Sequence, residues 1–247
     1  MIDNKGKQTT FSFGIKTEMS RNDFMVSDCN KEALSWIDLW PQWNKNGLVI
    51  YGPKGCGKTH LAHLFAEKIN FYIEKPQKIP FYDCKRINMK NVEKICSSCD
   101  VIVLENLSEN INQEALFHLF NHFCENGKYM LWTSLIAPAR LNLSLKDLQS
   151  RLNMLPAVEI KEPDDIMLRA LVVKLFNDRQ LRISPEILEY IVTNTQRSFS
   201  YVENLVKEID EISLAYKSTV NYKVVKAALE NLNNADENNE PDLFFNL

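Results

Sequence analysis

Glycine and an excess of charge of one sign are both scarce in this sequence. The 247 residues include only 7 glycines, and 29 lysines and arginines stand against 32 acidic residues, which leaves a formal net charge of −3. Proteins whose main function is to bind nucleic acid carry a strongly basic face. The near balance of basic and acidic residues therefore argues against a protein of that class. With 45% hydrophobic residues, the chain can bury a core as one large domain or as a medium domain with a small one.

Long hydrophobic runs and a secretory pattern are also absent. No apolar stretch approaches the roughly 18 residues of a membrane span, and the N-terminal sequence does not resemble a signal peptide. The 6 cysteines are scattered, and Cys96-x-x-Cys99 has no second pair that would complete a zinc site. We therefore expect a cytoplasmic protein with reduced thiols and no contact with a membrane.

The order of apolar segments predicts a two-part chain. Helical patterns alternate with short apolar strands, a pattern typical of a parallel sheet covered by helices; the strands are expected at 48–51, 79–83, 101–105, 129–134 and 157–160. Beyond residue 163 the pattern is helical only. We predict an N-terminal extension (1–20), an α/β base (21–162), a helical lid (163–232) and an acidic, asparagine-rich, disordered tail (233–247).

Three of the glycines lie together in GPKGCGKTH, which fits the phosphate-loop pattern G-x-x-x-x-G-K-[S/T]. The segment follows a predicted strand and begins a predicted helix, as this loop requires. Its glycines let successive backbone N–H groups turn toward phosphates, and the helix N-terminus adds positive potential. A nucleotide is therefore expected to contact Gly52, Pro53, Lys54, Gly55, Cys56, Gly57, Lys58, Thr59 and His60.

The loop and a second strand together predict a magnesium–nucleotide site. Lys58 can reach the β- and γ-phosphates, and the Thr59 hydroxyl can ligate Mg²⁺. The strand VIVLENL (101–107) lies where the second acidic motif of such a protein belongs, and Glu105 is placed to hold the Mg²⁺ shell. Asn106 stands where a glutamate would polarise the attacking water. Because an amide cannot accept that proton, roughly 10²–10⁴ of general-base assistance is lost, and the chain alone should hydrolyse ATP slowly.

The segments YGPKGCGKTHLAHLFAE, LQSRL and VEIKEPDD together resemble the AAA+ module of the DnaA family of replication initiators. The resemblance is closer to the short DnaA homologues of the Hda family, in their alphaproteobacterial form, and covers nearly the whole chain. It implies a parallel sheet of strand order 5-1-4-3-2, an all-α lid, and ADP or ATP with Mg²⁺ between them. It also implies an ADP-bound regulator that docks on the sliding clamp, the β subunit of DNA polymerase III, and stimulates ATP hydrolysis by DnaA.

The same resemblance assigns further site residues. Ser150-Arg151-Leu152 matches the segment that supplies an arginine finger, so Arg151 is expected to act on the ATP of a neighbouring DnaA. Thr133 falls at the strand end called sensor 1, and Leu135 stands where the initiator usually carries an aspartate. Arg197 is the nearest arginine to the lid position called sensor 2, although counting along the helix places Ser200 there.

Two short segments resemble clamp-binding peptides. QTTFSF begins at Gln8 and has apolar residues at its fourth and sixth positions, Phe11 and Phe13. EPDLFF, near the other end, offers Leu243 and Phe244 as the alternative. In extended peptides of this kind, the amide fixes the register while apolar side chains fill sockets on the partner. DNA would then be reached only through the clamp.

Two other functions remain open from the sequence. One is a helicase-loader-like or other AAA+ enzyme that cycles on its own ATP, against which Asn106 argues. The other is a DNA-binding paralogue of the initiator, against which the acidic balance argues; the helix-turn-helix domain of DnaA also has no counterpart here. The sequence leaves open whether the chain is itself an enzyme, whether it forms homo-oligomers, and whether ADP or ATP is preferred.

Overall fold

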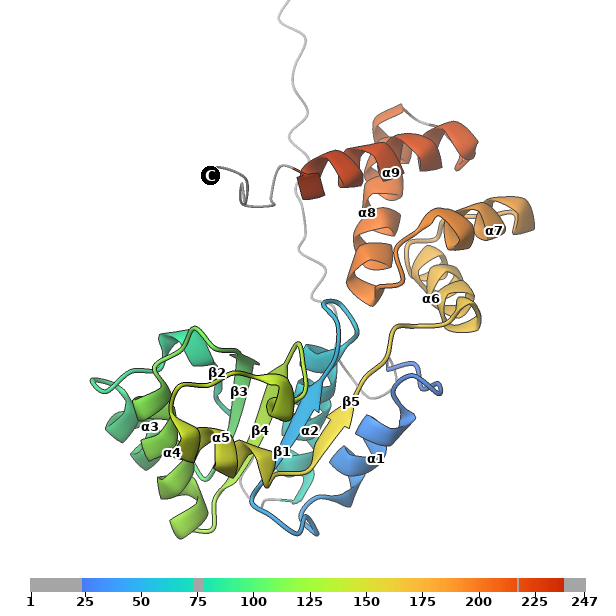
Figure 1. Ribbon diagram of the computed structural model, residues 1–247. Coiled ribbons are helices and arrows are strands. Elements are labelled where there is room, and N and C mark those ends of the chain that lie inside the picture. The colour runs from blue at the N-terminus through green and yellow to red at the C-terminus, as the bar shows by residue number, and fades with distance from the viewer. Residues whose placement is uncertain (1–23, 73–77, 217, 238–247) are drawn as a thin grey trace, which may run out of the picture.

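The computed structural model describes residues 24–72, 78–216 and 218–237. Figure 1 shows an α/β base with a helical lid above it, and the strands of the base point their carboxyl ends toward the lid. Along the chain the base contains α1 (Lys31–Leu39), β1 (Gly47–Tyr51), α2 (Lys58–Tyr72), β2 (Phe81–Asp83), the 3-10 turn η1 (Cys84–Arg86), α3 (Val92–Ser98), β3 (Val101–Leu107), α4 (Gln113–Glu125), β4 (Tyr129–Ser134), the 3-10 turn η2 (Pro138–Arg140), α5 (Lys146–Asn153) and β5 (Ala157–Glu159).

The five described strands form one parallel sheet in the order β2-β3-β4-β1-β5. This is the order 5-1-4-3-2 read from the other edge, so the predicted fold class and strand order are confirmed. Near-continuous apolar runs such as YMLWTS suit a parallel sheet, because helices cover both of its faces. The phosphate loop follows directly after the carboxyl end of β1.

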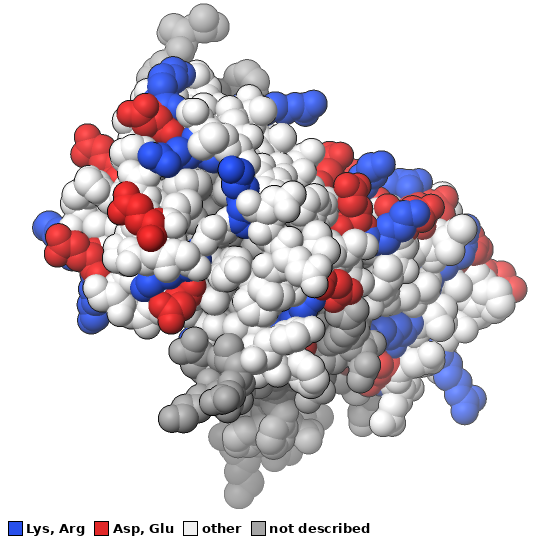
Figure 2. All heavy atoms as spheres, turned by 90° about the horizontal axis from the view of Figure 1, so that it is seen from below, with Lys and Arg blue, Asp and Glu red and all other residues white. Residues whose placement is uncertain are grey.

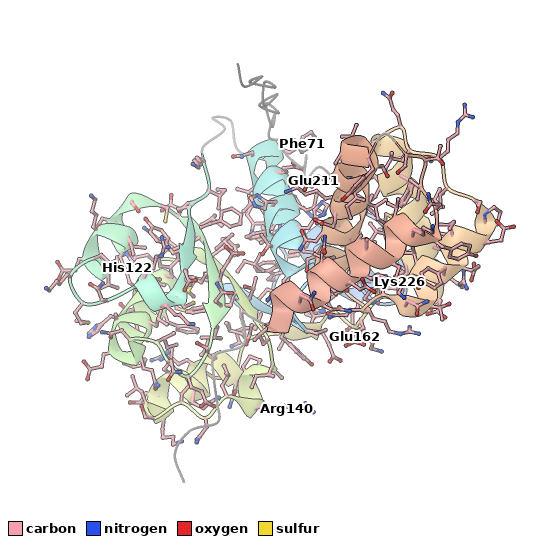
Figure 3. The ribbon with its side chains drawn as sticks, turned by 90° about the horizontal axis from the view of Figure 1, so that it is seen from above. Phe71, His122, Arg140, Glu162, Glu211 and Lys226 are labelled. Carbon is pink, nitrogen blue, oxygen red and sulfur yellow. The ribbon has the colours of Figure 1, made fainter. Side chains whose placement is uncertain are left out.

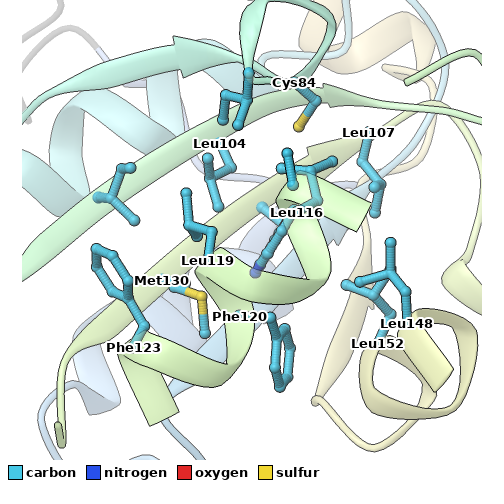
Figure 4. Close-up of a cluster of buried hydrophobic side chains, with 14 of the residues drawn as sticks. Cys84, Leu104, Leu107, Leu116, Leu119, Phe120, Phe123, Met130, Leu148 and Leu152 are labelled. Atoms are coloured by element: carbon cyan, nitrogen blue, oxygen red, sulfur yellow. The ribbon is translucent and has the colours of Figure 1, made fainter. Parts of the chain in front are cut away.

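Alternate side chains of each strand enter two separate cores. On β1, Leu48 and Ile50 pack with α1 and α2, while Val49 packs on the side of α3, α4 and α5. Figure 4 shows the second core, where helix α4 and helix α5 lie over the strands; the labelled side chains include Leu104, Leu116, Leu119, Phe123, Met130 and Leu148. Helices thereby pack on both faces of the sheet and hold the carboxyl ends of its strands in place.

The lid has a core of its own. It contains α6 (Asp165–Asp178), α7 (Pro185–Asn194), α8 (Phe199–Tyr216) and α9 (Tyr222–Glu237), and buries an apolar cluster between them. The Asp164 side chain caps α6 by accepting a hydrogen bond from the Met167 N–H at 2.8 Å. Figure 3 shows from above that α9, with Lys226, lies across the molecule from α4, with His122.

The beginning of the predicted disordered tail is helical, which corrects that expectation in part. Helix α9 continues to Glu237. Asn233, where disorder was expected to start, accepts a hydrogen bond from the Tyr201 hydroxyl of α8 at 2.9 Å, and this contact ties the end of α9 to the lid. Composition alone indicated a polar tail, but a polar helical turn can be held in place by one such tertiary contact.

The surface opposite the lid carries charges of both signs. In Figure 2, lysine and arginine side chains are interspersed with aspartate and glutamate on the face seen from below. In this view the basic side chains of the described residues form no continuous stripe of the kind that follows the phosphates of a duplex. Of the helices in the described ranges, none combines the length and the apolar character needed to cross a lipid bilayer.

Candidate nucleotide site

The phosphate loop turns between β1 and α2 in a conformation that its glycines permit. Gly55 and Gly57 have φ angles of 73° and 96°, a region that L-residues with a side chain rarely adopt. Lys54 is exposed at the tip, whereas Cys56 is buried with 2% of its surface exposed. Burial raises the pKa of the Cys56 thiol, so this side chain is neutral at physiological pH and the positive charge of the loop comes from its lysines.

Lys58 is held inside the turn of the loop. Its ammonium group donates hydrogen bonds to the carbonyl oxygens of Gly52 at 2.8 Å and Pro53 at 2.7 Å, and lies 3.7 Å from the Cys56 sulfur. A cation in this place faces the position of phosphates bound by the N–H groups of the loop. His60, in the first turn of α2, packs edge-on against Phe24 with ring centroids 5.1 Å apart.

The two predicted magnesium ligands are brought together across the sheet edge. The Thr59 hydroxyl donates a hydrogen bond to Glu105 Oε1 at 2.8 Å. Within the described ranges, three or more His, Cys, Asp or Glu side chains are nowhere grouped so that they could hold a metal ion. A hydroxyl and one carboxylate nevertheless fit Mg²⁺, which takes few protein oxygens and completes its shell with water and substrate phosphates.

Asn106 has a partner that sequence reasoning missed. β3 bulges between Leu104 and Leu107, and Asn106 lies there with φ 60°. Its side-chain Nδ2 donates to Asp83 Oδ2 at 2.8 Å, and its backbone N–H donates to Thr133 Oγ1 at 3.3 Å. A carboxylate of the neighbouring strand therefore lies beside Asn106 and accepts from its amide; an acid at the end of the segment FYD was the available signal.

The end of β4 closes this side of the site. Thr133 and Ser134 are both buried, and the Ser134 hydroxyl donates to the Leu107 carbonyl oxygen at 3.1 Å. Leu135 follows with 61% of its surface exposed. The predicted sensor 1 segment therefore contacts the bulge at Asn106, and the side chain after it is an exposed hydrocarbon without hydrogen-bonding capacity.

The lid contacts the phosphate loop through the first turn of α8. The backbone N–H of Phe199 donates to the Gly55 carbonyl oxygen at 2.9 Å. Arg197, the predicted sensor 2 residue, is turned to another partner: its Nη2 donates to Asp165 Oδ1 at 2.7 Å, and both side chains are about half exposed. The guanidinium is thus engaged by the first turn of α6.

Arg151 lies in the last turn of α5, a helix at the front of the base in Figure 1. Its guanidinium carbon lies 5.5 Å from the centre of the Phe117 ring of α4. A cation over an aromatic face is attracted by the ring quadrupole. The ion pairs found among the described residues do not include Arg151. The predicted clamp-binding residues Gln8, Phe11, Phe13, Leu243 and Phe244 lie outside the described residues.

Comparison with known proteins gives full-length initiators as relatives. The DnaA of Bacteroides thetaiotaomicron is 28% identical over 189 residues, which cover 71% of this chain and 39% of the relative. The DnaA of Francisella philomiragia is 24% identical over 250 residues, covering 94% and 51%. The chain therefore spans about half, or less, of the length of these curated relatives.

Solved structures share the fold. Domain III of the Thermotoga maritima replication initiation protein DnaA superposes with a TM-score of 0.75 at 20% identity, over 87% of this chain and 97% of that chain. A replication initiator DnaA bound to AMPPCP and single-stranded DNA superposes with a TM-score of 0.63 at 19% identity, over 85% and 79%. The family model of the bacterial DnaA ATPase domain matches residues 15–159, which is more than half of the chain. The chain therefore belongs to the bacterial DnaA ATPase domain family.

Proposed function

We propose that this protein is a cytoplasmic, nucleotide-binding regulator that limits replication initiation by stimulating ATP hydrolysis on DnaA. The observation that carries the proposal is the setting of Arg151, whose guanidinium rests on the Phe117 ring without an ion-pair partner among the described residues. An arginine held in this way keeps its charge and its donors for a neighbouring molecule. A guanidinium placed against a γ-phosphoryl group accelerates hydrolysis on the order of 10³–10⁵.

The nucleotide of this chain has a structural role in the proposal. ADP or ATP would be held by the N–H groups of the phosphate loop and by Lys58, with Mg²⁺ beside Thr59 and Glu105. When bound, it supplies negative charge that satisfies the loop and joins base to lid. We expect ADP to bind at least as tightly as ATP, because a protein that acts on a partner's ATP has no need to exchange its own.

The chain itself is expected to hydrolyse ATP slowly, which fits the role of activator. The Asn106 amide donates to Asp83 and cannot take a proton from water, and Leu135 cannot hydrogen-bond a γ-phosphate. A steady-state turnover near 1 s⁻¹, at the bottom of the usual range for enzymes, would contradict this and favour a helicase-loader-like or other AAA+ enzyme. The second candidate is a DNA-binding paralogue, favoured by the initiator relatives; salt-sensitive binding to plain duplex would support it.

Docking on the sliding clamp would bring the regulator to DNA-bound DnaA. The proposed clamp-binding peptide is the one with Gln8, Phe11 and Phe13. The alternative is the peptide with Leu243 and Phe244. Replacing Phe11 and Phe13 by Ala should abolish clamp binding and leave nucleotide affinity unchanged. If deleting residues 1–15 has no effect on clamp binding and deleting residues 240–247 abolishes it, the second peptide is the one that binds the clamp.

The decisive experiment is Arg151→Ala in an assay of ATP hydrolysis by DnaA on clamp-loaded DNA. The variant should fold, bind ADP and bind the clamp as the wild type does, yet lose stimulation by a factor on the order of 10³ or more. Arg169→Ala is the matched control, because Arg169 is a surface arginine paired with Glu189 at 2.7 Å on the lid and should keep full stimulation. Undiminished stimulation by Arg151→Ala removes Arg151 from the mechanism.

A further inference from the structure

The first turn of α8 makes a direct hydrogen bond to the phosphate loop. The first N–H groups of a helix have no partner within the helix, and here the N–H of Phe199 donates to the Gly55 carbonyl oxygen at 2.9 Å. The same peptide carries the Cys56 N–H, which donates to the Pro53 carbonyl oxygen at 3.4 Å. The lid bond therefore attaches α8 to the backbone of the phosphate loop itself.

Two serine hydroxyls cover the same glycine. Ser198 Oγ and Ser200 Oγ lie 3.1 Å apart, and they are the nearest atoms to a Cβ built on Gly55, far closer than real contacts allow. Ser198 also accepts a hydrogen bond from the Tyr201 N–H at 3.2 Å, which fixes its side chain as a cap of α8. The absence of a Cβ at Gly55 is thus what lets the lid rest on the loop.

Every one of these lid groups is uncharged. A backbone N–H and two hydroxyls meet the loop, while the adjacent Arg197 is paired with Asp165 at 2.7 Å. A guanidinium is always charged and would favour the ligand with the greater negative charge. A ligand shifts a conformational equilibrium only by its difference in affinity for the two states, and a neutral contact to a loop carbonyl does not depend on a third phosphate.

We propose that Ser198, Phe199 and Ser200 form a neutral latch that holds the lid on the phosphate loop and does not distinguish a nucleoside triphosphate from a diphosphate. The second half rests on the proposed nucleotide binding; the first does not. Such a latch lets the regulator keep one arrangement of base and lid whichever nucleotide it carries. The activator would then present Arg151 without a cycle of its own.

The amide of Phe199 reports the latch directly, because a first-turn amide without a partner exchanges rapidly with solvent. Residue-resolved hydrogen exchange on the full chain should show protection of this amide in the nucleotide-free wild type. Gly55→Ala should reduce the protection at least tenfold. Gly57→Ala is the matched control: it places the same Cβ at a positive φ in the same loop, but nothing lies within 4 Å of that Cβ, so protection should remain.

A rescue variant separates lid contact from damage to the loop. Adding Ser198→Gly and Ser200→Gly to Gly55→Ala removes the colliding hydroxyls and should restore most of the protection. An unprotected Phe199 amide in the wild type, or equal losses in the two glycine variants, overturns the latch.

The nucleotide arm compares ADP with the non-hydrolysable analogue AMPPCP, each with Mg²⁺, at saturation. Protection of the Phe199 amide should agree within about twofold, since RT ln 2 is well below one hydrogen bond. Protection more than tenfold greater with AMPPCP overturns the neutral latch, because the lid then senses the third phosphate. If the wild type binds neither nucleotide, the proposed function is wrong. The protection of the Phe199 amide in the nucleotide-free protein would still support the lid contact.

Discussion

The two sides of the phosphate loop are built from different chemistry. On the base side, Lys58 brings a full charge into the loop, and the Thr59 hydroxyl lies 2.8 Å from Glu105 Oε1, beside which Mg²⁺ is proposed to bind. On the lid side, a backbone N–H and two hydroxyls meet Gly55. Charge on the base suits a site that must attract phosphates, and neutral contacts on the lid suit a cover that must stay in place. Because the two sets of groups differ, we expect that mutations can change phosphate binding by the base without changing the contact of the lid, and the reverse.

The largest effect is expected at Lys58. Lys58→Ala removes the charge inside the loop, and two charge-assisted hydrogen bonds to phosphate of about 1.5–3 kcal/mol each are lost, so affinity for ADP–Mg²⁺ should fall about 100-fold or more. Titration calorimetry measures the change. The control is Lys54→Ala, since Lys54 belongs to the same loop but is exposed at its tip; it should cost less than tenfold. Equal losses would mean that the net charge of the loop, rather than the place of Lys58, attracts the nucleotide.

A moderate effect is expected at the pair Asp83 and Asn106, which holds the edge of the base. Asp83→Asn removes the carboxylate that accepts from the Asn106 amide at 2.8 Å, and Asn106→Asp sets two carboxylates against each other. Each change should lower the free energy of unfolding by about 1 kcal/mol. The exchanged variant, Asp83→Asn with Asn106→Asp, rebuilds one acid facing one amide and should recover most of that loss.

Urea unfolding of the four proteins gives the coupling energy of this pair. Two single losses of about 1 kcal/mol and near-complete recovery in the exchanged variant correspond to a coupling energy of about 2 kcal/mol, within the range for residues in contact. Additive losses in the exchanged variant would show that the two side chains act independently and that their hydrogen bond does not stabilise the edge of the base.

How far the sequence predicts this molecule depends on whether a feature is local. The phosphate loop, its strand and its helix follow from neighbouring residues, and the strand order follows from the family pattern. Asp83 escaped notice because its contact with Asn106 depends on the parallel register of β2 and β3, which pairs Asp83 with Glu105. The stacking of Arg151 on the Phe117 ring likewise depends on how α4 and α5 pack, which no spacing along the chain encodes.

The ion pair of the predicted sensor 2 residue, Arg197, could not be predicted from the sequence for the same reason. Arg197 and Asp165 are 32 residues apart, and only the folded lid sets the start of α6 beside the start of α8. Counting along the helix indicated Ser200, and Ser200 is indeed one of the two serines that cover Gly55. Counting along the helix thus indicated a residue that lies beside the loop, whereas the role of Arg197 toward a nucleotide stays a prediction.

The smallest effect is expected from Arg197→Ala, which tests whether the lid is neutral toward phosphate. The ion pair with Asp165 is about half exposed on both sides, and exposed pairs of this kind contribute under about 1 kcal/mol to stability, less at high salt. The matched variant Arg169→Ala breaks the pair that joins α6 to Glu189 of α7, also at 2.7 Å, and should give a similar small loss in urea unfolding. Neither variant should change the ratio of the affinities for ADP and AMPPCP. If Arg197→Ala weakens AMPPCP binding tenfold while ADP binding is unchanged, Arg197 leaves Asp165 to read the third phosphate, and the lid side of the site is charged after all.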